Sequence, residues 1–115
     1  MKLKRVAILT NSIVNIDYLI KTISQKYDID DIIIFSDSNQ ILDIGDYAIF
    51  SSFYLKFFDG SVVFTNTDDY LAYKDTIVSN EIFLLSDADD LIAANIDRSI
   101  LVKNKTTLIA KESAL

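Results

Sequence analysis

The 115-residue sequence contains no cysteine, no histidine and no proline, and it has only two glycines. Without cysteine or histidine, the chain cannot form the usual zinc sites, a thiol nucleophile or an imidazole acid–base catalyst. Two glycines are too few for a familiar phosphate-binding loop, and neither G-x-G-x-x-G nor G-x-x-x-x-G-K-[ST] occurs. The sequence therefore predicts no catalytic residue and no cofactor.

The chain also lacks a long hydrophobic run near its start. The apolar segment that follows residues 1–5 ends at Asn11 and Ser12, which is too short for a signal-peptide core or a membrane span. Half of the residues are apolar, and the length suits one domain with a core that needs no disulfide or metal. We therefore expect residues 1–115 to form a single soluble, cytoplasmic domain that does not contact membranes.

Positive charge is scarce in the middle of the chain. Residues 28–97 carry only Lys56 and Lys74 against fifteen acids, a net charge of −13, whereas residues 1–27 carry +4 and residues 98–115 carry +3. A protein that binds duplex nucleic acid normally presents a basic stripe, so this acidic middle argues against such a partner.

Apolar runs alternate with amphipathic segments along most of the chain. Strands are expected at residues 5–10, 32–35, 47–51, 62–65 and 81–85, with helices at 16–27, 36–44, 67–77 and 87–95. This alternation predicts a three-layer α/β sandwich, Rossmann-like or flavodoxin-like, with a mostly parallel sheet. Residues 100–102 and 108–110 flank a polar turn and predict a short C-terminal β-hairpin.

Residues 47–66 hold seven of the thirteen aromatic residues and are expected to form the centre of the core. Two structures are open for residues 53–65. Asp59-Gly60 can close a hairpin between two strands, or residues 54–58 can form a helical turn within a short parallel crossover. In either case, five strand residues should be almost fully buried in one sheet: Ile8, Ile33, Ile49, Val63 and Leu84.

Small polar residues follow the expected strands, where ligands bind in open parallel sheets. The candidate ligand-binding residues are Asn11, Ser12, Asp37, Ser51, Ser52, Asn66 and Asp87. The favoured alternative is that these residues cap the helices that follow, because capping requires the same residue types. Asp37 occupies the position at which a dinucleotide-binding fold holds a ribose, but the glycine turn of that fold is missing.

Asp87, Asp89 and Asp90 match the D-x-D pattern through which some glycosyltransferases bind a metal–nucleotide complex. Fifteen of the 115 residues are aspartates, so such a triplet arises readily by chance. Acids are also favoured in the first turn of a helix by its dipole. We therefore expect these three acids to serve a helix start, and no metal site is predicted.

Aromatic residues between positions 47 and 58 exceed what a small core needs. This group consists of Tyr47, Phe50, Phe53, Tyr54, Phe57 and Phe58. Most should pack in the core, while an exposed remainder would mark a protein contact. Phe53, Tyr54 and Phe57 are the predicted partner surface, for another protein or for a second copy in a homo-oligomer.

The segments YAIFSSFYLKFFDGSVVFTNTDDYL and EIFLLSDADDL together resemble the N-terminal half of GT-B-type glycosyltransferases, including short versions from phages. In that family, the N-terminal half mainly receives the acceptor and the C-terminal half holds the sugar nucleotide. The resemblance implies a reduced relative that cannot transfer a sugar alone. Two functions follow: a non-enzymatic binding protein, such as a phage accessory factor, which we prefer, or a glycosyltransferase-like half-domain that acts with a partner.

Overall fold

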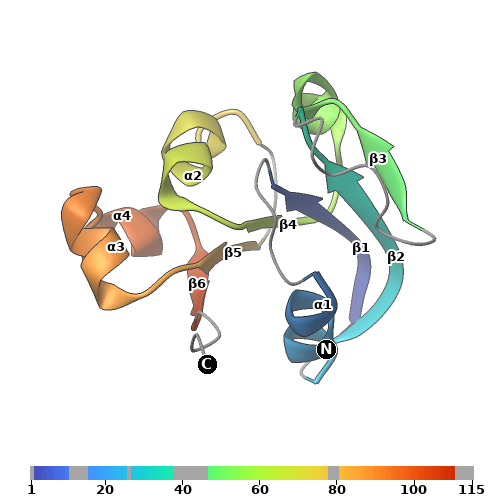
Figure 1. The fold of residues 1–115 in the computed structure, drawn as a ribbon, viewed down its shortest axis with the longest axis horizontal. Helices are drawn as coiled ribbons and strands as arrows, with labels where there is room; N and C mark the ends of the chain where they lie inside the picture. The colour runs from blue at the N-terminus through green and yellow to red at the C-terminus, as the bar shows by residue number, and fades with distance from the viewer. Residues whose placement is uncertain (1, 11–15, 26, 38–46, 78–80, 111–115) are drawn as a thin grey trace.

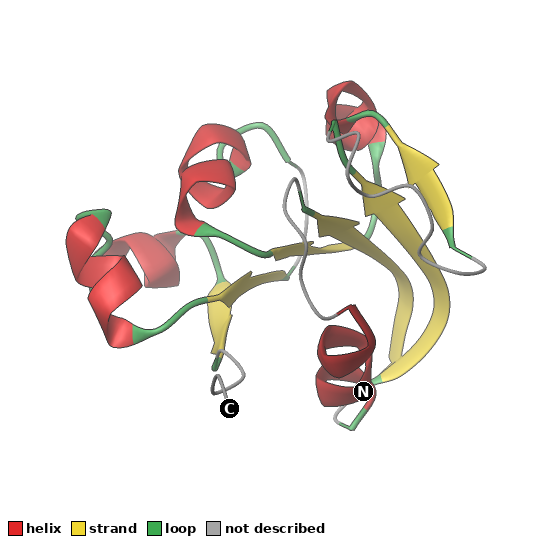
Figure 2. Cartoon of the chain, viewed as in Figure 1, coloured by secondary structure: helices red, strands yellow, loops and turns green. Residues whose placement is uncertain are grey.

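The structure is a computed structural model that describes residues 2–10, 16–25, 27–37, 47–77 and 81–110. A twisted six-stranded sheet runs through the molecule, with helices on both of its faces (Figures 1 and 2). The strands are β1 (Lys2–Leu9), β2 (Asp28–Phe35), β3 (Ala48–Phe50), β4 (Ser61–Phe64), β5 (Ile82–Leu85) and β6 (Thr106–Ile109). All neighbouring pairs are parallel, in the order β3-β2-β1-β4-β5-β6, so the predicted Rossmann-like α/β fold is confirmed.

Two hydrophobic clusters form the core, one on each face of the sheet. The helical segments are α1 (Ile16–Ser24), the 3₁₀ helix η1 (Ser52–Phe57), α2 (Thr67–Tyr73), α3 (Ala88–Ala93) and α4 (Arg98–Lys103). Leu19 and Ile23 of α1 pack on one face, against side chains such as Ile8. Leu55 of η1 and Tyr70 of α2 pack on the other face. Alternate residues of a strand point to opposite faces, which is why the continuous apolar run of β1 supplies both clusters.

The five residues predicted to be buried divide according to their strand's place in the sheet. Ile8, Val63 and Leu84 lie in β1, β4 and β5 and are fully buried, as predicted. Ile33 in β2 is only partly buried, and Ile49 in β3 is 38% exposed. The prediction is therefore wrong for Ile49 and incomplete for Ile33. β3 is a short edge strand with one neighbour, so its side chains lack the cover that a central strand receives.

The connection from β3 to β4 is a short parallel crossover, and the hairpin alternative is wrong. Ten residues, 51–60, join the two strands, and six of them form η1. This length lies near the lower limit for a parallel connection. It leaves room only for the six-residue 3₁₀ helix η1, where a longer crossover would place a full α-helix. Residues 47–66 are therefore split between the core and the surface, contrary to the prediction that they form the centre of the core.

The predicted C-terminal hairpin is wrong in its first half. Residues 100–102 belong to helix α4, whose first turn is capped by the Asp97 carboxylate, which accepts from the Ile100 N–H at 3.1 Å. The second half does form a strand, β6, but it pairs in parallel with β5. Ile109 of β6 is buried in the cluster on the α1 face, and this burial places the strand in the main sheet.

The helix expected at residues 36–44 lies largely outside the described residues. None of the described helices has the length and apolar character needed to cross a bilayer.

Candidate functional site

The predicted polar rim lies along the carboxyl ends of the strands, and three of its members cap helical segments. The side chains of Ser51, Asn66 and Asp87 accept from backbone N–H groups two or three residues later, at 3.3, 2.8 and 2.9 Å respectively. These bonds satisfy N–H groups that a helix start leaves without partners. The capping interpretation is thus confirmed for these three residues, and a ligand-binding role for them stays a prediction. Asn11 and Ser12 lie outside the described residues.

Asp37 holds the end of β2 to the start of η1. Its Oδ1 accepts from the Ser51 hydroxyl at 3.0 Å and from the Ser52 backbone N–H at 3.0 Å, and its Oδ2 accepts from the Ser52 hydroxyl. The buried Ser52 hydroxyl also lies 3.2 Å from the hydroxyl of Tyr73 in α2. The network therefore joins β2, η1 and α2 at one edge of the sheet. The serines occupy both carboxylate oxygens, which favours a structural role for Asp37 over ribose binding.

The same hydrogen bonds favour the ionised form of the Asp37 carboxyl. The Ser52 hydroxyl is the largest cause that holds the pKa of the Asp37 carboxyl below its ordinary value of 3.8; burial opposes it, and the Ser52 N–H and the Ser51 hydroxyl add to the lowering. A pKa that is lower in the folded than in the unfolded state stabilises the fold above the unfolded-state pKa. This stabilisation is lost as the pH falls through the folded-state pKa.

Asp37→Asn should therefore lower stability at neutral pH by less than about 1 kcal/mol, since solvent screens the exposed carboxylate. The difference from the natural chain should shrink as the pH falls through the acid range below 3.8. Chemical denaturation across pH measures both effects. The Ser52→Ala variant should show the same weakened dependence on pH, because it removes the largest cause of the pKa shift. An Asp37→Asn difference that is constant with pH would contradict this assignment.

The three acids of the D-x-D segment lie at the start of α3. Asp89 and Asp90 lie in its first turn, as predicted, whereas Asp87 precedes that turn as the N-cap. Among the residues that the structure describes, no three acidic side chains come together in a geometry that could hold a metal ion. The expectation that these acids bind no metal stays a prediction.

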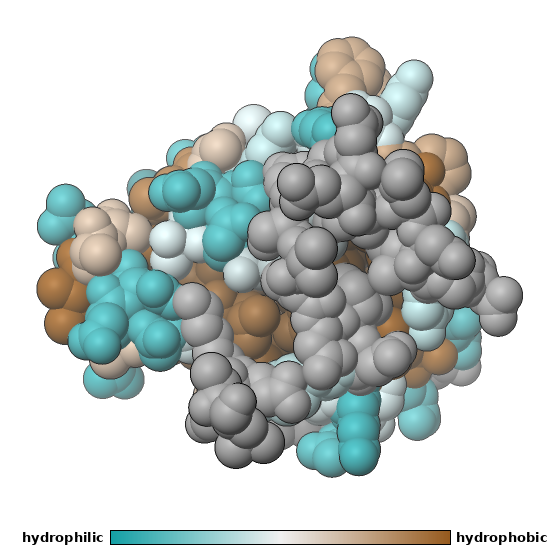
Figure 3. All heavy atoms as spheres, viewed as in Figure 1, coloured by the Kyte–Doolittle hydropathy of each residue, from teal (hydrophilic) through white to brown (hydrophobic). Residues whose placement is uncertain are grey.

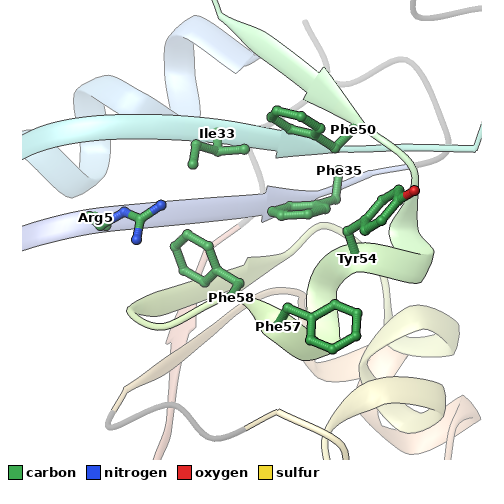
Figure 4. A pocket seen from close by; sticks show the side chains of 7 residues that line it. All are labelled: Arg5, Ile33, Phe35, Phe50, Tyr54, Phe57 and Phe58. Carbon is green, nitrogen blue, oxygen red and sulfur yellow. The ribbon is translucent and has the colours of Figure 1, made fainter.

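An open, mostly apolar pocket lies on the face of the sheet beside η1. Its volume is about 430 Å³, and it is lined by Arg5 of β1, Ile33 and Phe35 of β2, Phe50 of β3, Tyr54 and Phe57 of η1, and Phe58. We call it the Arg5 pocket. Figure 4 shows Arg5 at one end and Tyr54 at the other, with the ring of Phe35 between them. This cavity brings together one cation and five aromatic rings.

The short β3–β4 crossover explains why this pocket is open. η1 and the residue that follows it cover the sheet with Leu55 and Phe58, which are buried, but they do not extend over Phe50 at the sheet edge. The sequence analysis missed Arg5, Ile33 and Phe35 as pocket residues. One signal was available: Arg5 alternates with Ala7 and Leu9 in β1, and this alternation places a charged side chain on an otherwise apolar face.

The predicted partner surface lies on η1 and shares Tyr54 and Phe57 with the rim of the Arg5 pocket. Phe53, Tyr54 and Phe57 are 60%, 53% and 71% exposed. The Phe53 ring contacts those of Tyr54 and Phe57 edge to face, with centroids 5.4 and 6.5 Å apart. The Lys56 ammonium lies 4.1 Å from the centroid of the Phe53 ring. In the space-filling view, apolar atoms project at the top of the molecule, where Figure 1 places η1 (Figure 3).

Comparison with protein-family models, with curated proteins and with solved structures gives no match for this chain. Function is therefore argued from the geometry alone.

Proposed function

We propose that this chain is an α/β binding protein that contacts another protein through the exposed rings of η1. The observation that carries the proposal is the exposure of Phe53, Tyr54 and Phe57 on the 3₁₀ helix η1. Large aromatic residues are enriched at the centres of protein interfaces, where they supply much of the binding energy. A soluble monomer gains nothing from leaving three such rings in water.

The surface is also preorganised for binding. Edge-to-face contacts among the three rings, together with the Lys56 ammonium, hold the side chains in place before a partner arrives. Buried Leu55 and Phe58 anchor the turn on the sheet, and the Asp37–Ser52 hydrogen bonds fix its start. A rigid surface loses less side-chain entropy on association, which favours affinity. We expect no catalysis by the isolated chain.

Tyr54→Ala should weaken binding of the partner by about 2 kcal/mol, roughly thirtyfold in Kd, while the fold remains intact. The experiment has two stages. Partners are captured from native lysate on the natural chain and on the variant, and the affinity of each partner lost by the variant is then measured. Mass photometry of the purified chain tests the alternative that the partner is a second copy.

Ile92→Ala provides the matched control. Ile92 is an exposed apolar residue of α3 and lies outside η1, so its removal should leave partner binding unchanged. A partner that binds the natural chain and Tyr54→Ala equally well would contradict the role of η1. Equal losses with Tyr54→Ala and Ile92→Ala would show a general response to lost apolar surface and would also contradict it.

The order of the strands favours a glycosyltransferase-like half-domain as a second candidate. Strand order reverses between β1 and β4, and open parallel sheets bind nucleotides at such a point. The described polar groups there make internal contacts, since the Thr65 hydroxyl donates to the Leu9 carbonyl at 3.1 Å and Asn66 caps α2. Because these polar groups already bond within the protein, we rank this function second. Thermal-shift and hydrolysis assays with a panel of sugar nucleotides test it, and stabilisation by one of them, or its turnover, would promote it.

A further inference from the structure

The aromatic rings of the Arg5 pocket offer a fixed, flat and apolar surface. Phe35 packs edge to face with Phe58 at a centroid distance of 5.9 Å and lies tilted against Phe50 at 6.2 Å. Phe35 and Phe58 are buried, so the floor of the pocket is part of the core. Such a floor suits a planar apolar group, which can stack on one ring and meet the edge of another. The volume of about 430 Å³ suits a small molecule.

Arg5 gives the pocket a positive end. Its guanidinium carbon lies 5.3 Å from the centroid of the Phe58 ring, so the aromatic face positions the cation. Within the described part of the chain, no carboxylate oxygen lies within 4.0 Å of this guanidinium. A guanidinium matches the geometry of carboxylate, phosphate and sulfonate groups, with which it forms paired hydrogen bonds. Arg5 belongs to the basic N-terminal segment, residues 1–27, and brings one of its cations to an apolar cavity.

The nearest acid in the strand register is Asp31. It pairs with Arg5 across β1 and β2, and it shares the face of Ile33 and Phe35 because it precedes them by two and four residues. Asp31 is exposed. The Asp31 carboxylate should therefore repel an anion bound at Arg5 without itself pairing with the guanidinium. Removing this carboxylate gives an independent way to change the affinity of the site for an anion.

We propose that the Arg5 pocket binds a small molecule made of a flat apolar ring system and one anionic group. The rings of Phe35, Phe50 and Tyr54 contact the apolar body, and the Arg5 guanidinium pairs with the anion. This site goes beyond the proposed protein contact and does not depend on it, because it needs only the purified chain and a small ligand. The ligand is therefore defined by its single negative charge and its flat ring system.

Two fluorescent probes with similar ring systems test the proposal. Anilinonaphthalene sulfonate carries an anion, and N-phenylnaphthylamine is its neutral counterpart. The natural chain should bind the sulfonate with one-to-one stoichiometry and more tightly than the neutral probe. Arg5→Gln should weaken sulfonate binding about tenfold, as expected for loss of a charge-assisted hydrogen bond, and should leave the neutral probe unchanged. Phe50→Ala should weaken both probes.

Asp31→Asn provides a variant that gains affinity. Removing the acid beside Arg5 should tighten sulfonate binding about twofold to threefold and leave the neutral probe unchanged. A partly unfolded chain exposes apolar surface and would bind both probes more strongly, so a gain confined to the sulfonate supports the site even if Arg5→Gln is unstable. Near-ultraviolet circular dichroism checks that each variant keeps its packed core. Equal changes for both probes in Arg5→Gln and Asp31→Asn, or the absence of saturable binding, would overturn the proposal without affecting the partner contact on η1.

Discussion

Leu84→Ala should lower the free energy of unfolding by about 2–5 kcal/mol, because it removes a large side chain from a site that cannot collapse to fill the space. Leu84 is fully buried in β5, between Phe64 of β4 and Leu108 of β6 in the strand register. It belongs to the cluster that Leu55 and Tyr70 cover from η1 and α2. Urea denaturation followed by circular dichroism measures the change.

Ile49→Ala is the matched control for that measurement. Ile49 lies in the edge strand and is 38% exposed, so its truncation should cost about 1 kcal/mol or less. Ile33→Ala should fall between the two, at the low end of the range for buried residues, because Ile33 is partly exposed. Equal losses for Leu84→Ala and Ile49→Ala would contradict the arrangement of β5 inside the sheet and of β3 at an exposed edge.

Gly60→Ala should lower stability by about 2–4 kcal/mol, because the added methyl group meets both backbone strain and a steric clash. Gly60 has a φ of +154°, a conformation that other residues rarely adopt. A Cβ atom there would lie 2.7 Å from the backbone oxygen of Arg5 and 2.9 Å from the Phe58 ring. The ring can shift, but the Arg5 oxygen belongs to the central strand. The turn therefore cannot relax without moving β1 or β4.

Thermal and urea denaturation of Gly60→Ala measure this loss, and Asp59→Ala serves as its control. Asp59 is the exposed neighbour of Gly60 in the same turn, so truncating it should change stability by less than about 0.5 kcal/mol. The Gly60→Ala variant should also bind the sulfonate probe more weakly, since Phe58 and Arg5 both line the pocket. Unchanged stability in Gly60→Ala would show that the turn tolerates a side chain and would contradict the predicted strain.

The centre of the fold could be predicted from the sequence, and its edges could not. Continuous apolar runs such as Val6–Leu9 and Ile82–Leu85 require cover on both faces, so burial within a parallel sheet follows from their composition. Residues 48–50 are equally apolar, yet they form an exposed edge strand. The exposure of residues 48–50 follows from the position of β3 at the edge of the sheet, and amino-acid composition does not determine the order of the strands. Residues 100–102 show a related difficulty, because a short apolar run fits a strand or a helix, and the Asp97 cap decides for the helix.

The candidate site could be predicted only where its residues are neighbours in the chain. The rings of Phe53, Tyr54 and Phe57 lie within one short 3₁₀ helix, and the excess of aromatic residues in this part of the sequence suggested a surface. The Arg5 pocket joins residues from three strands and one turn, so it depends on the register of β1 with β2 and of β2 with β3. A sequence pattern does not give that register. The alternation of Arg5 with Ala7 and Leu9 in β1 indicated only that a charged side chain lies on an otherwise apolar face.

The place of β1 in the middle of the sheet has a consequence for how quickly the chain folds. β1 pairs with β2, which follows soon in the sequence, and also with β4, where the Thr65 hydroxyl donates to the carbonyl of Leu9, 56 residues earlier. The entropy of closing that long loop is lost before the contacts between β1 and β4 form. Folding should therefore be slower than for a helical bundle of this length. One edge of β1 should stay unpaired until β4 forms its hydrogen bonds with it. During that interval, the unpaired edge of β1 is exposed to other chains, and the rate at which β4 pairs with it sets the time available for aggregation.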